Sequence, residues 1–252
     1  KNSFLRKDSN DYVVFGLVSK DNVKSLIEST KSLSLLLNVE CEIDDNKQKR
    51  IEKLNILILK NNLKIEMFIN LAEVFIKNID KYSFLDFFLY LKELFSIETK
   101  VNLSELQGLF GELYALYYFK EILNLDISKY YQSSNKMKFD FSISNNKKMD
   151  VKTTLKTERI HHFTNEQLNS LRYDIKIISI MLQKDDKGVS LYDLIKRCKI
   201  LFSNNLSILL NIEKIIMRSE DTDLKTISYN ENYILDNLRI YDSKDIPRLT
   251  EK

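Results

Sequence analysis

Hydrophobic residues recur at two different spacings along the first part of the chain. Runs rich in Val, Ile and Leu at 12–18, 33–43 and 54–59 predict β-strands. Over 65–79 the apolar residues stand three or four positions apart, which predicts a helix, and a second, very apolar helix begins near Phe84. We expect these strands and helices to pack around their aromatic side chains as an N-terminal extension.

The second part of the chain mixes helical and strand patterns. A long helix is predicted over 103–123, with Asn102 as its N-cap and Glu105 reaching back toward the cap. The remaining pattern predicts strands at 138–144, 148–155 and 175–182, a strand or loop at 157–163, helices at 164–171, 190–203 and 206–218, and strand and loop over 233–252.

This order of elements indicates an α/β or mixed α+β fold with a mixed central sheet flanked by helices. We place an N-terminal strand-and-helix extension at residues 1–100 and a core domain at 101–252. The length allows one large domain or two small ones, and a hydrophobic core of this size needs no disulfide bonds or metal ions for stability. Only four Gly and one Pro occur, against typical usage of roughly 7% and 5%, which argues against a turn-rich all-β sandwich.

Several classes of protein are excluded by composition. The two cysteines, Cys41 and Cys198, lie far apart and provide no disulfide framework, which fits a reducing cytoplasm. The two histidines are adjacent, so a His-rich zinc site is excluded. The most apolar stretch, 84–91, is interrupted by Asp86 and is far too short to span a membrane.

The predicted helix 103–123 contains two of the four glycines, in the segment GLFGE. Each glycine costs roughly 0.8–1 kcal/mol relative to alanine in a helix interior, so a compensating gain is expected. A stripe of small residues results, and it predicts close approach to a neighbouring element: Ser104, Gly108, Gly111 and Ala115. Glu112 lies beside this stripe and can point into the contact, although a solvated surface position is the alternative.

Acidic residues occur in both strands of a predicted hairpin. In strand 138–144 alternation places Phe139 and Phe141 on one face and Asp140 on the other. In the following strand Asp150 and Lys152 share one face. Each acid therefore stands on the more polar face of its strand.

The register of the hairpin decides whether the two acids meet. A two-residue loop would set Phe141 opposite Asp150 and mix polar and apolar side chains on both faces, which is disfavoured wherever one face is buried. A three-residue loop, 144–146, pairs Phe141 with Met149 and Asp140 with Asp150. The hydrophobic pattern thus predicts that the two carboxylates face each other.

Two facing carboxylates repel each other unless a cation lies between them. Lys152 is one candidate, and a divalent ion is the other, because hard oxygen ligands suit Mg²⁺ or Mn²⁺. Phosphodiester hydrolysis uses such an ion to polarise the phosphoryl group and to generate hydroxide near neutral pH. A lysine beside it can orient or deprotonate the attacking water and offset developing charge.

The charge around these residues favours an anionic partner. Segment 129–162 holds three acidic residues and eight basic ones, within a chain whose net charge is only +3. Such a concentration is typical of phosphate-backbone binding, although a solvated basic hairpin is equally compatible with it. The basic residues are Lys129, Lys136, Lys138, Lys147, Lys148, Lys152, Lys156 and Arg159.

Glu112, Asp140, Asp150 and Lys152 fill the four places of the PD-(D/E)XK nuclease pattern, with Phe139 where the proline usually stands. The longer string GLFGEL, FDF, MDVKTT, HHFTNEQL and IPRLT resembles a branch of this superfamily found in bacterial restriction and anti-phage gene clusters. The resemblance is best over residues 80–175 and weaker over the N-terminal strands.

This resemblance implies a restriction-endonuclease-like core and a metal-dependent nuclease that cuts DNA. It implies that Asp140, Asp150 and the Val151 carbonyl bind Mg²⁺ or Mn²⁺, that Glu112 binds the metal or its water, and that Lys152 positions the nucleophile.

Further residues near the motif are candidates for substrate binding. Gln167 matches a glutamine typical of the branch, although capping of its own helix is an equal alternative. Of the adjacent histidines only one can face the site if they lie on a strand. The substrate-binding candidates are Gln167, Thr154, Lys156, Arg159 and His162.

The function expected from these residues is an Mg²⁺-dependent DNA endonuclease of bacterial restriction or anti-phage defence, located in the cytoplasm. The alternative is a non-catalytic DNA-binding or assembly subunit of a defence complex that retains the nuclease fold, and an RNA-processing nuclease is a weaker third. The expected partners are DNA, a second copy of the chain, or other defence subunits, and no membrane.

Overall fold

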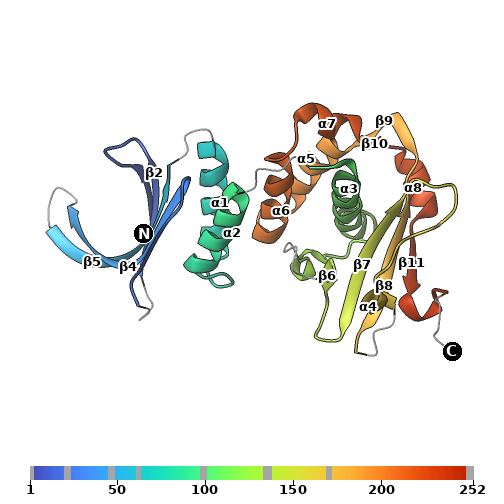
Figure 1. Ribbon diagram of the computed structural model, residues 1–252, viewed down its shortest axis with the longest axis horizontal. Helices are drawn as coiled ribbons and strands as arrows, with labels where there is room; N and C mark the ends of the chain where they lie inside the picture. The colour runs from blue at the N-terminus through green and yellow to red at the C-terminus, as the bar shows by residue number, and fades with distance from the viewer. Residues whose placement is uncertain are drawn as a thin grey trace. The chain divides into compact units, whose positions relative to one another are not determined.

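The computed structural model describes residues 3–19, 24–44, 49–60, 64–96, 101–132, 138–168 and 172–247. Contacts divide the chain into two compact units, Lys1–Ile97 and Glu98–Lys252. The expected boundary at residue 100 falls in 97–100, outside the described residues. Figure 1 shows both units, and each is described by itself.

The first unit is built on a five-stranded sheet with the order β1-β2-β5-β4-β3, in which every pair is antiparallel. Its central strands are the Val-, Ile- and Leu-rich runs predicted from the sequence, and the edge strands β1 and β3 were not predicted. The strands are β1 (Ser3–Lys7), β2 (Val13–Val18), β3 (Leu26–Ser29), β4 (Leu33–Asp44) and β5 (Lys49–Leu59).

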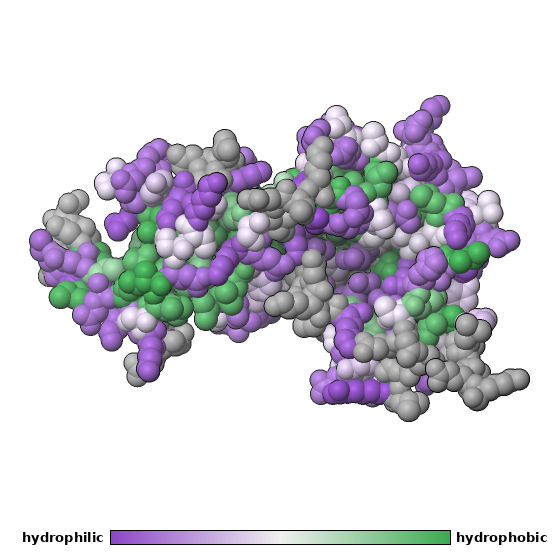
Figure 2. Space-filling view, viewed as in Figure 1, coloured by the Kyte–Doolittle hydropathy of each residue, from purple (hydrophilic) through white to green (hydrophobic). Residues whose placement is uncertain are grey.

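Two helices, α1 (Ile65–Lys77) and α2 (Phe84–Ser96), cover one face of this sheet. Phe75 of α1 stacks on Phe87 of α2 with ring centroids 4.5 Å apart, and both rings contact Phe15 of β2. The aromatic stripes are therefore core packing, as expected. Apolar side chains also gather on the visible surface of this unit (Figure 2). Ile27 and Ile51 are two of its exposed large hydrophobic residues.

The second unit combines a four-stranded sheet, a two-stranded β9–β10 pair and several helices. Its elements are α3 (Leu103–Tyr117), a π-helical turn (Tyr118–Ile122), a 3₁₀ turn (Ser128–Tyr130), β6 (Phe141–Ser142), β7 (Lys147–Thr154), α4 (Asn165–Leu168), β8 (Asp174–Met181), β9 (Lys184–Ser190), α5 (Leu191–Leu201), α6 (Leu206–Ile216), α7 (Asp221–Thr226), β10 (Ser228–Tyr229), α8 (Glu231–Asn237), β11 (Arg239–Asp242) and a second 3₁₀ turn (Ser243–Asp245).

The larger sheet of this unit has the order β11-β8-β7-β6. β7 runs parallel to β8, whereas β6 and β11 pair antiparallel with their neighbours. The sheet is therefore mixed, and the predicted mixed α/β fold, consistent with a restriction-endonuclease-like core, is confirmed. The largest core cluster forms where α3 packs against β7 and α5, with Phe110, Leu113 and Tyr114 almost fully buried.

Two predicted elements of this unit are wrong in part. The tail from residue 233 was expected to be strand and loop, but helix α8 precedes strand β11, and the Asn230 side chain caps it by accepting from the Tyr233 N–H. The strand expected at 138–144 begins only at Phe141. Among the described residues no helix is long and apolar enough to cross a membrane.

Candidate active site

Helix α3 approaches strand β7 closely at Gly111. A β-carbon at this position would lie 2.3 Å from Thr153 Cγ2 and 3.3 Å from Val151 Cγ1, so only glycine allows the approach. The predicted contact of the small-residue stripe is thus confirmed at Gly111, but it is wrong for Gly108, whose β-carbon would meet open space. Asn102 caps the helix as predicted, accepting from the Glu105 N–H.

Glu112 follows Gly111 directly and is half-buried rather than a solvated surface residue. Its Oε2 accepts a hydrogen bond of 2.6 Å from the Tyr131 hydroxyl. That hydroxyl in turn accepts a hydrogen bond from the Asn211 side-chain amide on α6. The carboxylate orientation is therefore fixed by two residues outside the nuclease pattern.

The hairpin β6–β7 has the register that the sequence predicts. Phe141 pairs with Met149 and Ser142 pairs with Lys148. The Ile143 N–H donates to the Lys147 carbonyl, so the loop consists of the three residues 144–146. The predicted register is confirmed.

The hairpin ladder stops before Asp140, however, because residues 138–140 bend away from strand geometry. As a result Phe141 lies in the core beneath α3, whereas Phe139 packs with Ile175 and Ile177 in a separate cluster. The prediction that the two phenylalanines share one face is therefore wrong. The reason is that the Asp140 side chain takes a backbone hydrogen-bond position on β7.

Asp140 Oδ2 accepts a hydrogen bond of 2.7 Å from the Val151 N–H. The N–H and C=O of one residue in a strand point to the same side. The Val151 carbonyl therefore points to the strand edge where the Asp140 carboxylate lies. This arrangement brings a carboxylate and a backbone carbonyl to one place, as the resemblance implied.

Asp150 is the most buried of the motif residues, with 3% of its surface exposed. Its Oδ1 accepts a hydrogen bond of 3.1 Å from the Gln167 amide. Its Oδ2 lies 2.6 Å from the Lys152 ammonium, so the two residues form an ion pair on β7.

The three carboxylates influence one another. Burial raises the pKa of Glu112, and the Asp150 charge raises it further. Burial, Glu112 and Asp150 together raise the pKa of Asp140 well above its ordinary value. Burial also raises the pKa of Asp150, while Lys152 opposes this shift. Three acids with one ammonium leave an excess of negative charge that a further cation would offset.

The donor set fits a hard divalent cation. Among the described residues no group of three or more His, Cys, Asp or Glu side chains is arranged closely enough to enclose a metal. Mg²⁺, however, typically takes only one or two carboxylates and keeps water or phosphate oxygens as its other ligands. Asp140, Asp150 and the Val151 carbonyl offer oxygen atoms of this kind, and Glu112 stands close enough to influence Asp140 electrostatically.

Gln167 caps its own helix, which was one of the two roles considered from the sequence, and its contact with substrate stays a prediction. Its Oε1 accepts from the Thr164 N–H at the start of α4, and its Nε2 holds Asp150. The helix predicted at 164–171 is described only for Asn165–Leu168, and residues 169–171 lie outside the described part.

The other substrate-binding candidates are not brought together. Lys156 and His162 are exposed, and the Thr154 hydroxyl is buried and accepts from the Lys156 N–H. Arg159 donates to the Ser179 and Asn237 carbonyls, so it joins the 157–163 segment to β8 and to the end of α8. Lys136 of the basic segment lies outside the described residues.

Sequence reasoning missed Tyr131 and Asn211, and of the two adjacent histidines it named His162, which is wrong, rather than His161. His161 is half-buried, and its Nε2 lies 2.6 Å from Ser179 Oγ, whereas His162 points outward. Neither Tyr131 nor Asn211 belongs to a local pattern, because their contacts span 19 and 80 residues of sequence. The adjacent histidines indicated that one of the pair would face the sheet, but not which one.

Comparisons with known proteins agree with this geometry. The profile of one family, described as "Putative PD-(D/E)XK family member, (DUF4420)", matches residues 3–252. No curated protein and no solved structure matches the chain. The family match extends over both units, beyond the residues 80–175 that carry the motif resemblance. A match over nearly the whole chain shows that the protein belongs to this PD-(D/E)XK family.

Proposed function

We propose that the protein is a metal-dependent DNA endonuclease of bacterial restriction or anti-phage defence, acting in the cytoplasm. Family membership supports nuclease activity in general. The observation that carries the finer proposal is the buried Asp150, which contacts Lys152 and Gln167 and acts electrostatically on Asp140 and Glu112. A buried group of acids beside one lysine is costly for stability, so a role in chemistry is its best explanation.

Each residue of the group has a distinct role in this proposal. Asp140, Asp150 and the Val151 carbonyl would hold Mg²⁺ or Mn²⁺, and Glu112 would hold the ion or its water. When bound, the ion supplies Lewis-acid polarisation of the phosphoryl group and a water of lowered pKa. Lys152 Nζ donates hydrogen bonds to the attacking water or to a phosphate oxygen and offsets the charge that develops there.

Positioning residues complete the arrangement. Gln167 fixes Asp150 from the side of α4, and Tyr131 fixes Glu112 from the side of the core. The exposed lysines of segment 129–162, such as Lys147 and Lys156, would bind the phosphate backbone beside the cleaved bond. The duplex is the proposed substrate, and a second copy of the chain would be needed to cut both strands in one encounter.

One observation favours the alternative of a non-catalytic DNA-binding or assembly subunit. The described residues contain no group of three acids close enough to enclose a metal. A subunit of this kind would bind DNA in a salt-dependent manner but would not cleave it. Variants at Asp150 and Lys152 would then leave its DNA affinity almost unchanged.

Cleavage of phage DNA distinguishes the two functions. Supercoiled DNA, methylated and unmethylated, is incubated with the protein in Mg²⁺ or in EDTA. The endonuclease proposal expects nicking in Mg²⁺ only, and loss of nicking in Asp150→Ala and Lys152→Ala. Lys148→Ala is the matched control, because Lys148 lies on the same strand but its ammonium is bound by Ser142 and the Ser144 carbonyl. Equal activity in Asp150→Ala, Lys152→Ala and the wild type would refute the assignment.

A further inference from the structure

A pocket of about 570 Å³ opens on the same face of the sheet as Asp150 and Lys152. In the parallel β7–β8 pair Asp150 stands opposite Ile177, and Lys152 stands opposite Ser179. Both Ile177 and Ser179 line the pocket. The pocket floor is therefore formed by the residues next to the candidate active site on the neighbouring strand.

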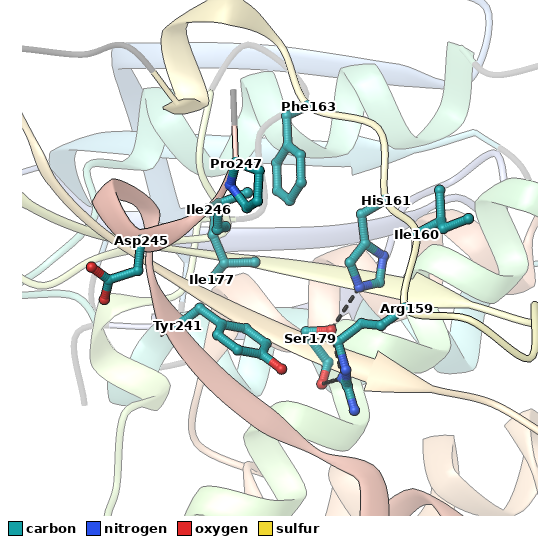
Figure 3. A pocket seen from close by; sticks show the side chains of 10 residues that line it. All are labelled: Arg159, Ile160, His161, Phe163, Ile177, Ser179, Tyr241, Asp245, Ile246 and Pro247. Atoms are coloured by element: carbon teal, nitrogen blue, oxygen red, sulfur yellow. Dashed lines mark hydrogen bonds between the residues drawn. The ribbon is translucent and has the colours of Figure 1, made fainter. Parts of the chain in front are cut away.

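One side of the pocket is polar. Ser179 is fully buried, and its Oγ accepts a hydrogen bond of 2.7 Å from Arg159 Nη1 and lies 2.6 Å from His161 Nε2 (Figure 3). Burial, with the nearby Arg159 charge, lowers the pKa of His161 to about 4. The ring is therefore neutral at physiological pH, and it carries one donor and one acceptor nitrogen.

The other side of the pocket is apolar and aromatic. In Figure 3 the side chains of Ile177, Ile246 and Pro247 lie opposite the polar group, and the Tyr241 hydroxyl points toward Ser179. Asp245, the acidic residue of the lining, directs its carboxylate away from the others.

Phe163 connects the pocket to the candidate active site. Its ring lines the pocket, and the Lys152 ammonium lies 5.9 Å from the ring centroid. A group bound in the pocket would thus lie one side chain away from the ammonium proposed to contact the cleaved phosphate. The pocket is close enough to receive another part of the same substrate strand.

We propose that this pocket receives the nucleobase of an unpaired nucleotide of the DNA strand held at Asp150 and Lys152. This inference rests on the proposed nuclease function and adds to it the form in which the substrate is bound. A nucleobase has two apolar faces and polar edges, which match the two sides of the pocket. Stacking on Tyr241, whose surface is 37% exposed, would stabilise the base without regard to its identity.

A base can enter the pocket only when it is single-stranded or turned out of the helix. The edge that the base normally pairs with would then face the polar side of the pocket, which Arg159 and His161 line. Binding of this kind predicts tighter association with strands that carry bases than with the same backbone without them. The preference for strands that carry bases would then depend on the aromatic ring of Tyr241.

The test measures fluorescence anisotropy of a labelled single-stranded oligonucleotide and of the same backbone made abasic, both in EDTA. Wild type and Tyr241→Phe should bind the base-bearing strand about ten-fold more tightly, as expected for one stacked base. Tyr241→Ala should lose this preference while its affinity for the abasic strand is unchanged. Because Tyr241 lies on the edge strand β11 and is exposed, its replacement should leave the fold intact, which thermal unfolding checks.

Equal affinity of the wild type for the two strands would overturn the proposal, as would binding to neither strand. A preference that persists in Tyr241→Ala would also overturn it, since stacking would then occur elsewhere. The measurement needs no metal and no cleavage. Absence of cleavage therefore refutes the nuclease proposal alone, and absence of a base preference refutes the pocket proposal alone.

Discussion

Asp140 Oδ2 accepts a hydrogen bond of 2.7 Å from the Val151 N–H, at the point where the next ladder bond of the β6–β7 hairpin would otherwise form. The side chain therefore lies immediately before the start of strand β6 and beside Asp150 at the edge of β7. One contact thus explains why the chain bends at 138–140 and why the two acids influence each other.

Replacement of Asp140 separates these two roles. In Asp140→Asn the amide oxygen can still accept from Val151, and burial and the neighbouring acids already disfavour the charge of Asp140, so we expect the variant to be at least as stable as the wild type. The negative charge is lost, and cleavage should fall at least about 100-fold. Chemical denaturation and a nicking assay measure the two effects, and retention of full activity in the stable variant would contradict the role.

The two glycines of α3 should respond in opposite directions to alanine. Gly111→Ala places a methyl group 2.3 Å from Thr153 Cγ2, and overpacking of this kind costs about 1–3 kcal/mol. Gly108→Ala meets open space and should gain up to about 1 kcal/mol from helix propensity. Thermal denaturation measures both variants, and each serves as the control for the other. Equal shifts of the melting temperature in the two variants would contradict the packing described.

Tyr131→Phe tests the positioning of Glu112. The variant removes the hydroxyl that donates to Glu112 Oε2 and leaves the ring in the core. Loss of a partner that orients a metal-binding carboxylate typically costs about 10–100-fold in metal affinity or activity. We expect the Mg²⁺ concentration for half-maximal cleavage to rise. An unchanged metal dependence, with the fold intact, would show that the contact is only structural.

His161 predicts a pH dependence of stability. Its pKa is lowered by burial from the ordinary 6.5 to about 4 in the folded protein. Between pH 6.5 and 4 the His161 ring binds a proton in the unfolded chain but not in the folded protein. The free energy of unfolding should therefore decrease as the pH falls through this range.

Urea denaturation across this range isolates the contribution of His161. His161→Gln keeps a polar group near Ser179 but cannot titrate, so its stability should decrease less than that of the wild type. His162→Gln, changed at the exposed neighbour, should follow the wild type. Parallel curves for the wild type and His161→Gln would contradict the burial of the ring.

Local patterns in the sequence predicted a substantial part of this structure. The hairpin register followed from alternation of Phe141, Met149 and their polar neighbours, because a slip by one residue would expose the apolar face. The Asn102 cap and the close approach at Gly111 followed from residue types whose local conformation or size is decisive. These features depend on near neighbours or on one strong steric constraint.

Other features depend on contacts that no local pattern encodes. The bend at 138–140 results from a side chain that replaces a backbone partner, which alternation cannot reveal. The Tyr131–Glu112 contact and the pocket bring together residues distant in sequence. Helix α8 has only seven residues, too few for a clear helical period.

The proposed nuclease requires Asp140 and Asp150 to hold a divalent cation beside Lys152. Electron paramagnetic resonance of Mn²⁺ titrated into the protein measures free and bound ion directly. The wild type should bind Mn²⁺, Asp140→Asn and Asp150→Asn should bind it at least about ten-fold more weakly, and Asp174→Asn on β8 should match the wild type. Mn²⁺ binding that is absent in the wild type, or equal in all four proteins, would contradict the claim.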